Sequence, residues 1–358
     1  MARLRTALTD TLGLEVPIVQ APVGSPTCPA LAAAVADAGG LGTLAVTWRD
    51  EAATREAVAE TARRTDGQFG VNIVVDPDAK EAPTECHVEV CLAEGVDVFS
   101  FSFGDAAPYV DRVHEAGGTV LQSVGSAAEA SEAVDAGVDV VVAQGWEAGG
   151  HVRSDVATMP LVPRVADAVE DTPVIAAGGI ADGRGVAAAL ALGADGAWLG
   201  TRFLATEEAR VHRLYRRRVL EADETDTVLS TLFDEGWPGV PHRVIGNGTV
   251  SEWGAAGEPE TGRPARCSPG PVGASPPGSA RTGALPRTPV DRRPDRSRRS
   301  DRDPSPDPGR RRTRSPGPDR SLGRRRREPS DRLTFDSRRH ELWGGFGLHK
   351  ANNIEDPN

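Results

Sequence analysis

Short aliphatic runs alternate with segments of helical pattern along the first 250 residues of the chain. A short aliphatic run predicts a strand of a parallel sheet, because such strands are buried on both faces. Successive runs begin 19 to 35 residues apart, which leaves room for one helix in each gap. The eight runs are Val16–Ala21, Gly42–Val46, Gly70–Val75, Val96–Phe101, Thr119–Val124, Val138–Ala143, Pro173–Ala177 and Gly196–Gly200.

The segments between these runs carry helix signals. Several end at a glycine just before the next run, for example at Gly39, Gly117, Gly137 and Gly193, and glycine is a common helix stop. The predicted helices include Pro29–Ala38, Ala52–Arg64, Tyr109–Ala116, Ala127–Ala136, Leu161–Val169 and Gly185–Leu192.

Eight buried strands that alternate with helices predict an α/β fold, a closed (β/α)8 TIM barrel over residues 16–220. A doubly wound open sheet is the alternative, since periodicity alone does not separate the two. A barrel would place the active site at the carboxyl ends of the strands and would favour a phosphate site in the loops after the seventh and eighth strands.

Charge divides the chain into two parts. Residues 1–250 hold 18 basic and 37 acidic side chains, a net charge of −19, whereas residues 251–358 hold 23 basic and 15 acidic ones, a net charge of +8. The second part is rich in Arg, Pro, Gly and Ser and lacks a hydrophobic period over most of its length, so we expect no core there. We therefore predict a catalytic barrel domain over residues 1–255 and a low-complexity, disordered tail over residues 256–358.

Three interpretations of the tail stay open. Its composition is what a GC-rich gene would give if it were read out of frame after about residue 263, and we favour this interpretation. An arginine-rich extension that binds nucleic acid electrostatically, or a partner, is the second, although few aromatic residues stand between its arginines to stack on bases. An inert linker is the third. The acidic barrel itself is not expected to bind nucleic acid.

Other classes of protein are disfavoured by the sequence. No run approaches the ~20 apolar residues of a membrane-spanning helix, and the N-terminus lacks the apolar core of a secretory signal. Four cysteines in 358 residues do not make a disulfide framework, so a cytoplasmic protein is expected. The spacing of Cys86 and Cys91 fits no common zinc pattern, and no metal site is predicted.

Glycine-rich turns follow the last two predicted strands. Gly178 and Gly179 follow the seventh, where backbone N–H groups can approach an anion closely. Leu199, Gly200 and Thr201 end the eighth and open a helix, whose N-terminus attracts phosphate. Two such turns after consecutive strands predict a phosphate site, with ordinary glycine turns as the alternative.

A histidine follows the sixth strand in a glycine-rich loop. Gln144 ends that strand, and Gly149 and Gly150 precede His151. The pKa of an imidazole lies near neutrality, so His151 at the barrel mouth is a candidate for proton transfer, against the alternative of a solvated loop histidine. Gln144 offers a donor and an acceptor to a ligand, whereas Glu147 is expected to be a solvated carboxylate.

Two amides lie inside predicted strands. Asn72 in the third strand needs hydrogen-bond partners when buried, so it is either a ligand contact or a satisfied core amide. The same two alternatives apply to Gln122 in the fifth strand, where a ligand contact is less expected. The first strand ends at Gln20 and is followed by Ala21, Pro22 and Val23.

These motifs together resemble the nitronate monooxygenase family, formerly called 2-nitropropane dioxygenases, which are FMN-dependent barrels. Enoyl-acyl-carrier-protein reductases that use FMN are a sister group with the same motifs. The resemblance covers about residues 15–250. The motifs are Gln20-Ala-Pro22, Phe69-Gly-Val-Asn72, Gln144-Gly-Trp-Glu-Ala-Gly-Gly-His151, Ala176-Ala-Gly-Gly-Ile180 and Leu199-Gly-Thr-Arg-Phe203.

The resemblance implies a role for each matching position. Ala21, Pro22 and Val23 would pass under the flavin ring, and Val23 stands where the family often has methionine. Trp198 stands where glutamine is frequent, which leaves Leu199, Gly200 and Thr201 as the secure contacts of that turn. The remaining implied FMN contacts are Asn72, Gln144, Gly149, Gly150, Gly178 and Gly179, and the implied catalytic base is His151.

The implied reaction is oxidative denitrification of an alkyl nitronate or nitroalkane by dioxygen, which gives a carbonyl compound and nitrite with FMN as the electron carrier. For a neutral nitroalkane, His151 would first remove the α-proton. An FMN-dependent reductase that uses NAD(P)H to reduce an enoyl thioester is the alternative, and a nucleic-acid-binding protein that acts through the arginine-rich tail is a second one.

Overall fold

The computed structural model describes residues 4–75, 82–233, 237 and 240–258. The predicted tail over residues 256–358 therefore lies outside the described residues, apart from its first three positions.

Eight parallel strands form the main sheet, in the order in which they follow one another along the chain. Bridge pairing of Val19 with Leu41 joins the first strand to the second, so the sheet closes on itself and the prediction of a TIM barrel is confirmed. The open-sheet alternative is wrong for the same reason. The eight strands are β1 (Ile18–Gln20), β2 (Gly42–Ala45), β3 (Phe69–Val74), β4 (Val98–Ser102), β5 (Thr119–Val124), β6 (Val140–Gln144), β8 (Val174–Ala177) and β9 (Gly196–Leu199).

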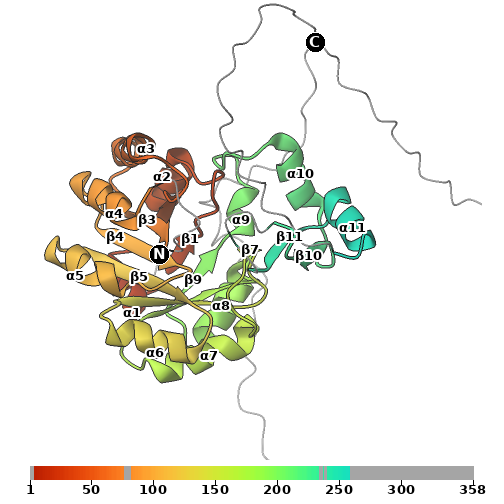
Figure 1. The fold of residues 1–358 in the computed structure, drawn as a ribbon. Coiled ribbons are helices and arrows are strands. Elements are labelled where there is room, and N and C mark those ends of the chain that lie inside the picture. Colours follow the sequence, from red (N-terminus) through yellow and green to blue (C-terminus); the bar gives the residue numbers. More distant parts are fainter. Residues whose placement is uncertain (1–3, 76–81, 234–236, 238–239, 259–358) are drawn as a thin grey trace, which may run out of the picture. The chain divides into compact units, whose positions relative to one another are not determined.

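Helices cover the outer face of the barrel (Figure 1). Side-chain caps fix the starts of some of these helices, as where Asp50 accepts from Ala53 N and Ser126 accepts from Glu129 N. Gly137 and Gly193, at φ 95° and 99°, make the predicted turns from helix to strand. The covering helices are α2 (Pro29–Asp37), α3 (Glu51–Arg64), α4 (Thr84–Ala93), α5 (Ala107–Glu115), α6 (Ala127–Asp135), α7 (Thr158–Ala168) and α8 (Gly183–Ala191).

Two apolar cores lie on either side of the strands. Val71, Phe99 and Phe101 belong to the layer between strands and helices, whereas Val98, Leu121, Val140, Ile175 and Trp198 belong to a separate cluster inside the barrel. Leucines of the N-terminal helix α1 (Ala7–Leu12) join this inner cluster and so close the barrel at the amino ends of its strands.

The interior of the opposite end is more polar. Side chains alternate between faces along a strand, so the residues two positions beyond inner ones also point inward. Ser100 and Ser102 continue the inner face of β4 from Val98, and Gln144 continues that of β6 from Val142. The carboxyl ends of the strands therefore form a polar mouth, and α1 blocks the other end.

A small antiparallel sheet was not predicted. It joins β10 (Thr227–Ser230), β11 (His242–Ile245) and β7 (Gly150–His151), in the order β10-β11-β7. In Figure 1, β10 and β11 lie beside α11 (Gly248–Ala255). Along the chain, α9 (Thr201–Leu204) and α10 (Arg213–Glu221) lie between β7 and β10. This sheet brings the end of the described chain to the loop that carries His151.

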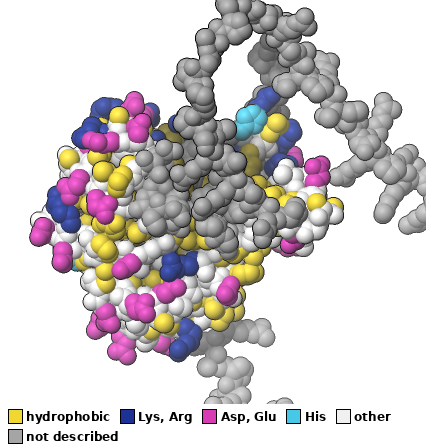
Figure 2. Space-filling view, in the orientation of Figure 1, with side chains coloured by type: hydrophobic (Ala, Val, Ile, Leu, Met, Phe, Trp, Pro, Cys, Tyr) yellow, Lys and Arg dark blue, Asp and Glu magenta, His cyan; other side chains and the backbone are white. Residues whose placement is uncertain are grey.

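Charged side chains spread over the outer helical face. Figure 2 shows Asp and Glu side chains across this face, with basic side chains beside several of them. Examples are the ion pairs of Arg112 with Glu89 and of Arg64 with Glu60. None of the helices in the described part of the chain has the length and apolar character that crossing a membrane requires.

Candidate functional site at the mouth of the barrel

Three glycine-containing loops meet at the mouth. A Cβ placed on Gly200 would lie 3.5 Å from the Ala21 Cβ and 4.0 Å from Val23 Cγ2. A Cβ placed on Gly149 would lie 3.5 Å from Thr201 Oγ1. The loops after β1, β6 and β9 are thus in contact, and the first and last are also joined by the bond from Ala21 N to the Leu199 carbonyl oxygen, at 2.8 Å.

The loops after β6 and β8 are joined through Thr158, the first residue of α7. Its hydroxyl donates to Glu147 Oε2 at 2.9 Å and approaches the Gly178 carbonyl oxygen at 3.1 Å, and its backbone N–H donates to the same carboxylate at 2.8 Å. Glu147 is exposed, as expected from the sequence, and its carboxylate in addition accepts hydrogen bonds at the N-terminus of α7. A Cβ on Gly145 would lie 2.1 Å from Thr158 Oγ1, so only glycine fits there.

Gln144 shapes the loop that leads to His151. Its Nε2 donates to the His151 carbonyl oxygen at 3.3 Å, and its Oε1 accepts from Arg153 N at 3.2 Å. A primary amide has two donor hydrogens and two acceptor lone pairs, so one of each is left for a ligand. The residue is thus a loop-positioning group in this structure, with spare capacity toward the mouth.

Asn72 lies on β3, three strands away from Gln144 in the order of the barrel. Its Oδ1 accepts from Ser100 Oγ at 3.1 Å, and its Nδ2 bonds to Ser102 Oγ at 3.3 Å, with the residue 5% exposed. Gln122 instead accepts from Ala106 N at the start of α5, which is a structural contact. Asn72 therefore has partners within the protein and, as a primary amide, one further donor.

His151 is held among aromatic rings. Its ring stacks on Trp237 at 4.0 Å between centroids and on His242 at 4.2 Å, and Phe103 approaches edge-on at 6.3 Å. Nε2 lies 3.3 Å from the Phe233 carbonyl oxygen. A carbonyl only accepts, so Nε2 carries the hydrogen and Nδ1 of the neutral ring holds the lone pair that can take a proton.

Burial makes this imidazole neutral at physiological pH. Desolvation, helped by the charge of His242 and opposed by the bond to Phe233, lowers the pKa of His151 to about 4. Desolvation also lowers the pKa of His242. Both rings are therefore uncharged near pH 7, and His151 is available as a proton acceptor.

Sequence reasoning missed the aromatic partners of His151. Trp237 is 6% exposed and packs on Phe103 at 4.7 Å, and Trp48, which is 43% exposed, lies 6.0 Å from it. The only local signal for His242 was the short run that became β11, and nothing near Trp237 marked it as part of a site. Their roles depend on folding that joins segments about 90 residues apart.

The glycine loops fit a flavin in their chemistry. Side chains at Gly149 or Gly200 would fill space between the joined loops, and Gly178 and Gly179 adopt φ of 110° and 70°, which glycine allows most readily. Backbone N–H groups that no bulky side chain shields can approach a phosphate closely. The amide side chains of Asn72 and Gln144 and the ring of Trp198 lie on the inner face of the barrel. Pro22 and Gly150 lie within the same loops.

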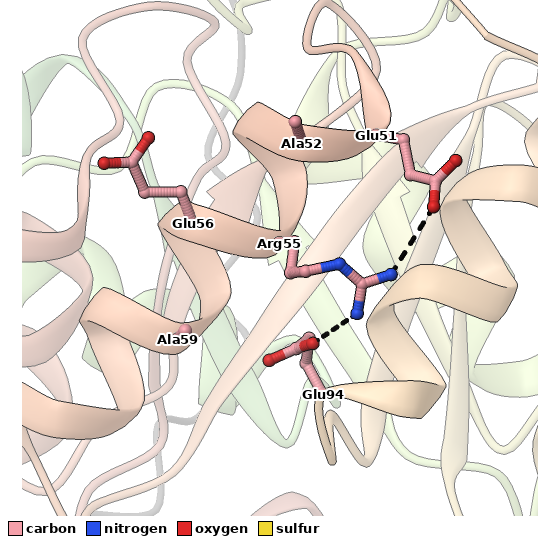
Figure 3. Close-up of a pocket in the computed structure, with 6 residues that line it drawn as sticks. All are labelled: Glu51, Ala52, Arg55, Glu56, Ala59 and Glu94. Atoms are coloured by element: carbon pink, nitrogen blue, oxygen red, sulfur yellow. Dashed lines mark hydrogen bonds and ion pairs between the residues drawn. The ribbon is translucent and has the colours of Figure 1, made fainter.

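A separate surface hollow lies away from these loops. Figure 3 shows it on α3 and at the end of α4, where Arg55 reaches Glu94 at 2.5 Å and Glu51 at 3.4 Å. Its volume is about 530 Å³, and none of its lining residues comes from the mouth. Solvent-exposed ion pairs of this kind contribute little binding energy, so we assign it no role in the chemistry.

Known proteins resemble this chain over its barrel. A dehydrogenase of Rhodococcus jostii that acts on (3aS,4S,5R,7aS)-5-hydroxy-7a-methyl-1-oxo-octahydro-1H-indene-4-carboxyl-CoA is 41% identical over 251 residues, which are 70% of this chain and 68% of the relative. The protein of the same name in Mycobacterium tuberculosis is 43% identical, over 68% of this chain and 66% of its own length. The chain thus spans about two thirds of the length of these dehydrogenases.

Other relatives carry different names. A probable nitronate monooxygenase of Staphylococcus aureus is 33% identical, over 64% of this chain and 76% of its own. Among solved structures, FabK from Thermotoga maritima has a TM-score of 0.64 at 40% identity, covering 70% of this chain and 77% of that one. A nitroalkane oxidase from Streptomyces ansochromogenes has a TM-score of 0.62 at 34% identity, covering 70% and 82%.

The family itself is settled by a profile match. The profile of the nitronate monooxygenase family matches residues 5–264, which include every strand of the barrel and the small sheet. The resemblance inferred from the sequence motifs is thereby confirmed. The chain belongs to the nitronate monooxygenase family and is an oxidoreductase of a family that is in general flavin-dependent.

Proposed function

We propose that this chain is an FMN-dependent nitronate monooxygenase, which oxidises alkyl nitronates and nitroalkanes with dioxygen to a carbonyl compound and nitrite. The observation that carries the proposal is the neutral His151, whose Nε2 is held by the Phe233 carbonyl so that Nδ1 is left to take a proton beside the glycine loops. The proposal places catalysis in residues 1–255.

Residues of four loops would hold FMN. Backbone N–H groups at Gly178, Gly179, Gly200 and Thr201 would bind the phosphate, since these positions offer close approach without a lysine. Ala21, Pro22 and Val23 would lie under the ring, with Leu199 next to them. Asn72, Gln144, Gly149 and Gly150 would complete the contacts, the two amides through their remaining donors. When bound, FMN supplies the electron transfer between substrate and dioxygen.

The protein's part in the reaction is proton transfer and exclusion of water. His151 Nδ1 takes the α-proton of a neutral nitroalkane, and the electron pair of the C–H bond stays with the substrate as the nitronate. The imidazolium that results keeps its bond to the Phe233 carbonyl, and the face of Trp237 at 4.0 Å favours the cation. Trp237 and Phe103 also exclude water from this side of the base.

A second function is favoured by the identity of two relatives. The proteins at 41% and 43% identity are named for a carboxyl-CoA substrate, which is a thioester. The α-hydrogen of a thioester is acidic for the same electronic reason as that of a nitroalkane, so the same neutral imidazole could serve either substrate. The alternative is therefore an FMN-dependent oxidoreductase of acyl thioesters, including reduction of an enoyl thioester by NAD(P)H.

The purified full-length chain distinguishes these functions. Its visible spectrum should show bound flavin, and extraction should yield FMN. Nitrite release from an alkyl nitronate in air, without a nicotinamide, is the result we expect. Bleaching of the flavin by NADH or NADPH, followed by turnover of an enoyl thioester and no nitrite release, would replace the proposal with the thioester alternative. A preparation that binds no flavin would contradict both.

A further inference from the structure

His242 lies directly opposite His151 in the small sheet. The two residues are register partners in the antiparallel pair of β11 with β7, and their rings stack at 4.2 Å with 24° between their planes. Phe233, whose carbonyl holds His151, also packs edge-on against the His242 ring at 5.6 Å. The same short segment thus fixes both imidazoles.

Two stacked partners and one hydrogen bond constrain the ring of His151. Trp237 lies 4.0 Å away with 16° between planes, and His242 stacks on the same ring. A flip of the imidazole about Cβ–Cγ would put the carbon Cε1 where Nε2 lies and break the bond from Nε2 to the Phe233 carbonyl. The stack therefore favours the one orientation in which Nδ1 is left unbonded.

Packing alone does not account for an imidazole at position 242. Nδ1 of His242 is buried and has no hydrogen-bond partner among the described residues, which costs free energy. A phenyl ring would stack equally well and would leave no polar atom unsatisfied. The nitrogen atoms of His242 must therefore be explained by something other than the fit of the ring.

Two arginines lie near the pair in the sequence. Arg243, next to His242, donates through Nη2 to the Trp146 carbonyl oxygen at 3.0 Å, while its buried Nε has no partner among the described residues, and Arg153 pairs with Glu129 at 2.9 Å. The rings of Trp237, Phe103 and Phe233, which pack around the pair, are uncharged. Asp234 and Glu235 lie outside the described residues. Among the described groups, each imidazole is thus the titratable partner of the other.

We infer that His242 is a positioning residue for the base. It holds the imidazole of His151 in the orientation that leaves Nδ1 unbonded, and in acid, where His242 itself takes a proton, its charge opposes protonation of that nitrogen. The inference rests on the proposed function in treating His151 as the base, but the coupling of the two rings does not depend on the substrate.

The direction of the electrostatic effect follows from the stack. A protonated His242 would put a positive charge 4.2 Å from the His151 ring and would oppose a second proton there. This charge is one reason why the pKa of His151 is lowered to about 4. Removing the charge at position 242 should therefore raise the pKa of His151, whatever reaction the enzyme performs.

The test compares His242→Phe with His242→Ala in the flavin-loaded full-length protein. Histidine labelled with ¹³C at Cε1 allows the seven histidines to be titrated by NMR, with the His151→Asn variant assigning the resonance. We expect the midpoint of His151 to move above 4 in both variants. His114→Gln, which alters an exposed imidazole paired with Asp139, is the matched control and should leave the midpoint unchanged.

Measurements of turnover distinguish two effects of His242, the orientation of the His151 ring by stacking and the effect of its charge. With a neutral nitroalkane at pH 7.5, His242→Ala should lower kcat by about 10- to 100-fold, the scale of a misplaced catalytic group. His242→Phe should restore most of kcat, because it restores the stacked ring, and a preformed nitronate should be little affected by either variant. Both variants should retain flavin.

Three results would overturn the inference. An unchanged His151 midpoint in both variants would remove the electrostatic coupling. Equal loss of kcat in the Phe and Ala variants would show that stacking does not orient the base. Loss of flavin or a lower Tm in the Phe variant would show that the imidazole supports the fold. If no nitro compound is turned over at all but the midpoint moves, the proposed function fails and the coupling of the rings stands.

Discussion

Replacing His151 with asparagine tests the base directly. Asparagine is a shorter polar side chain that cannot take a proton at neutral pH, and its amide does not extend to the position from which Nε2 bonds to the Phe233 carbonyl. General-base help is worth about 10²- to 10⁴-fold, so turnover of a neutral nitroalkane should fall by that factor. A preformed nitronate has already lost its proton and should lose much less activity.

The unusual environment of the ring adds a pH signature. At pH 5.5 an imidazole with a pKa of about 4 is about 97% neutral, whereas one with the ordinary value of 6.5 is about 9% neutral. The kcat/KM of the wild-type enzyme for a nitroalkane should therefore change little between pH 7.5 and 5.5, whereas an ordinary histidine would lose about tenfold. The decrease of kcat/KM on the acid side of the pH profile should appear only near pH 4.

The assay follows nitrite release against pH in air, with flavin content measured from the visible spectrum of each preparation. The stability of the protein should also depend on the protonation of His151. Below about pH 6.5 the unfolded chain takes a proton on this imidazole and the folded chain does not, so Tm should fall as the pH drops from 6.5 toward 4. An acid limb near pH 6.5, or an asparagine variant that loses both activities equally while it keeps FMN, would refute the assignment of the base.

Three further substitutions test other parts of the structure. Gly179→Val should abolish flavin retention, because φ is 70° and a branched side chain would stand where the phosphate approaches; full flavin absorbance would contradict the phosphate placement. Gly145→Ala should lower the free energy of unfolding by about 1–3 kcal/mol in urea, since its Cβ would lie 2.1 Å from Thr158 Oγ1, whereas Gly248→Ala, with open space around it, should be neutral or slightly stabilising. Arg55→Ala should leave Tm, flavin content and turnover unchanged, since its ion pairs are exposed, and a change in turnover would give the surface hollow a role.

The barrel could be predicted because its signals are local. Most of the buried strands are short runs of mainly apolar residues, and glycines such as Gly137 and Gly193 follow the helices at the positions predicted from the sequence. The glycine-containing turns after β8 and β9 could be located for the same reason, because two or three adjacent residues mark each of them, and the phosphate site expected there stays a prediction.

The surroundings of His151, the proposed base, could not be predicted in the same way. β7 has two residues and β11 has four half-buried ones, too short and too mixed for a periodic signal. Trp237 and His242 acquire their roles only by meeting His151, which is far away in sequence. The hydrogen bonds of Glu147 at the N-terminus of α7 could not be predicted either, because only the folded chain brings the two together.

The small sheet also sets the order in which the enzyme becomes competent during synthesis. His151 in β7 emerges from the ribosome well before His242 in β11, and at about 5–20 residues per second the interval is roughly 5–20 s. Until Trp237 and then His242 have emerged, the imidazole lacks the two rings that stack on it in the folded protein. The surroundings of the proposed base are thus complete only after β11, the last strand of the described chain, has been made.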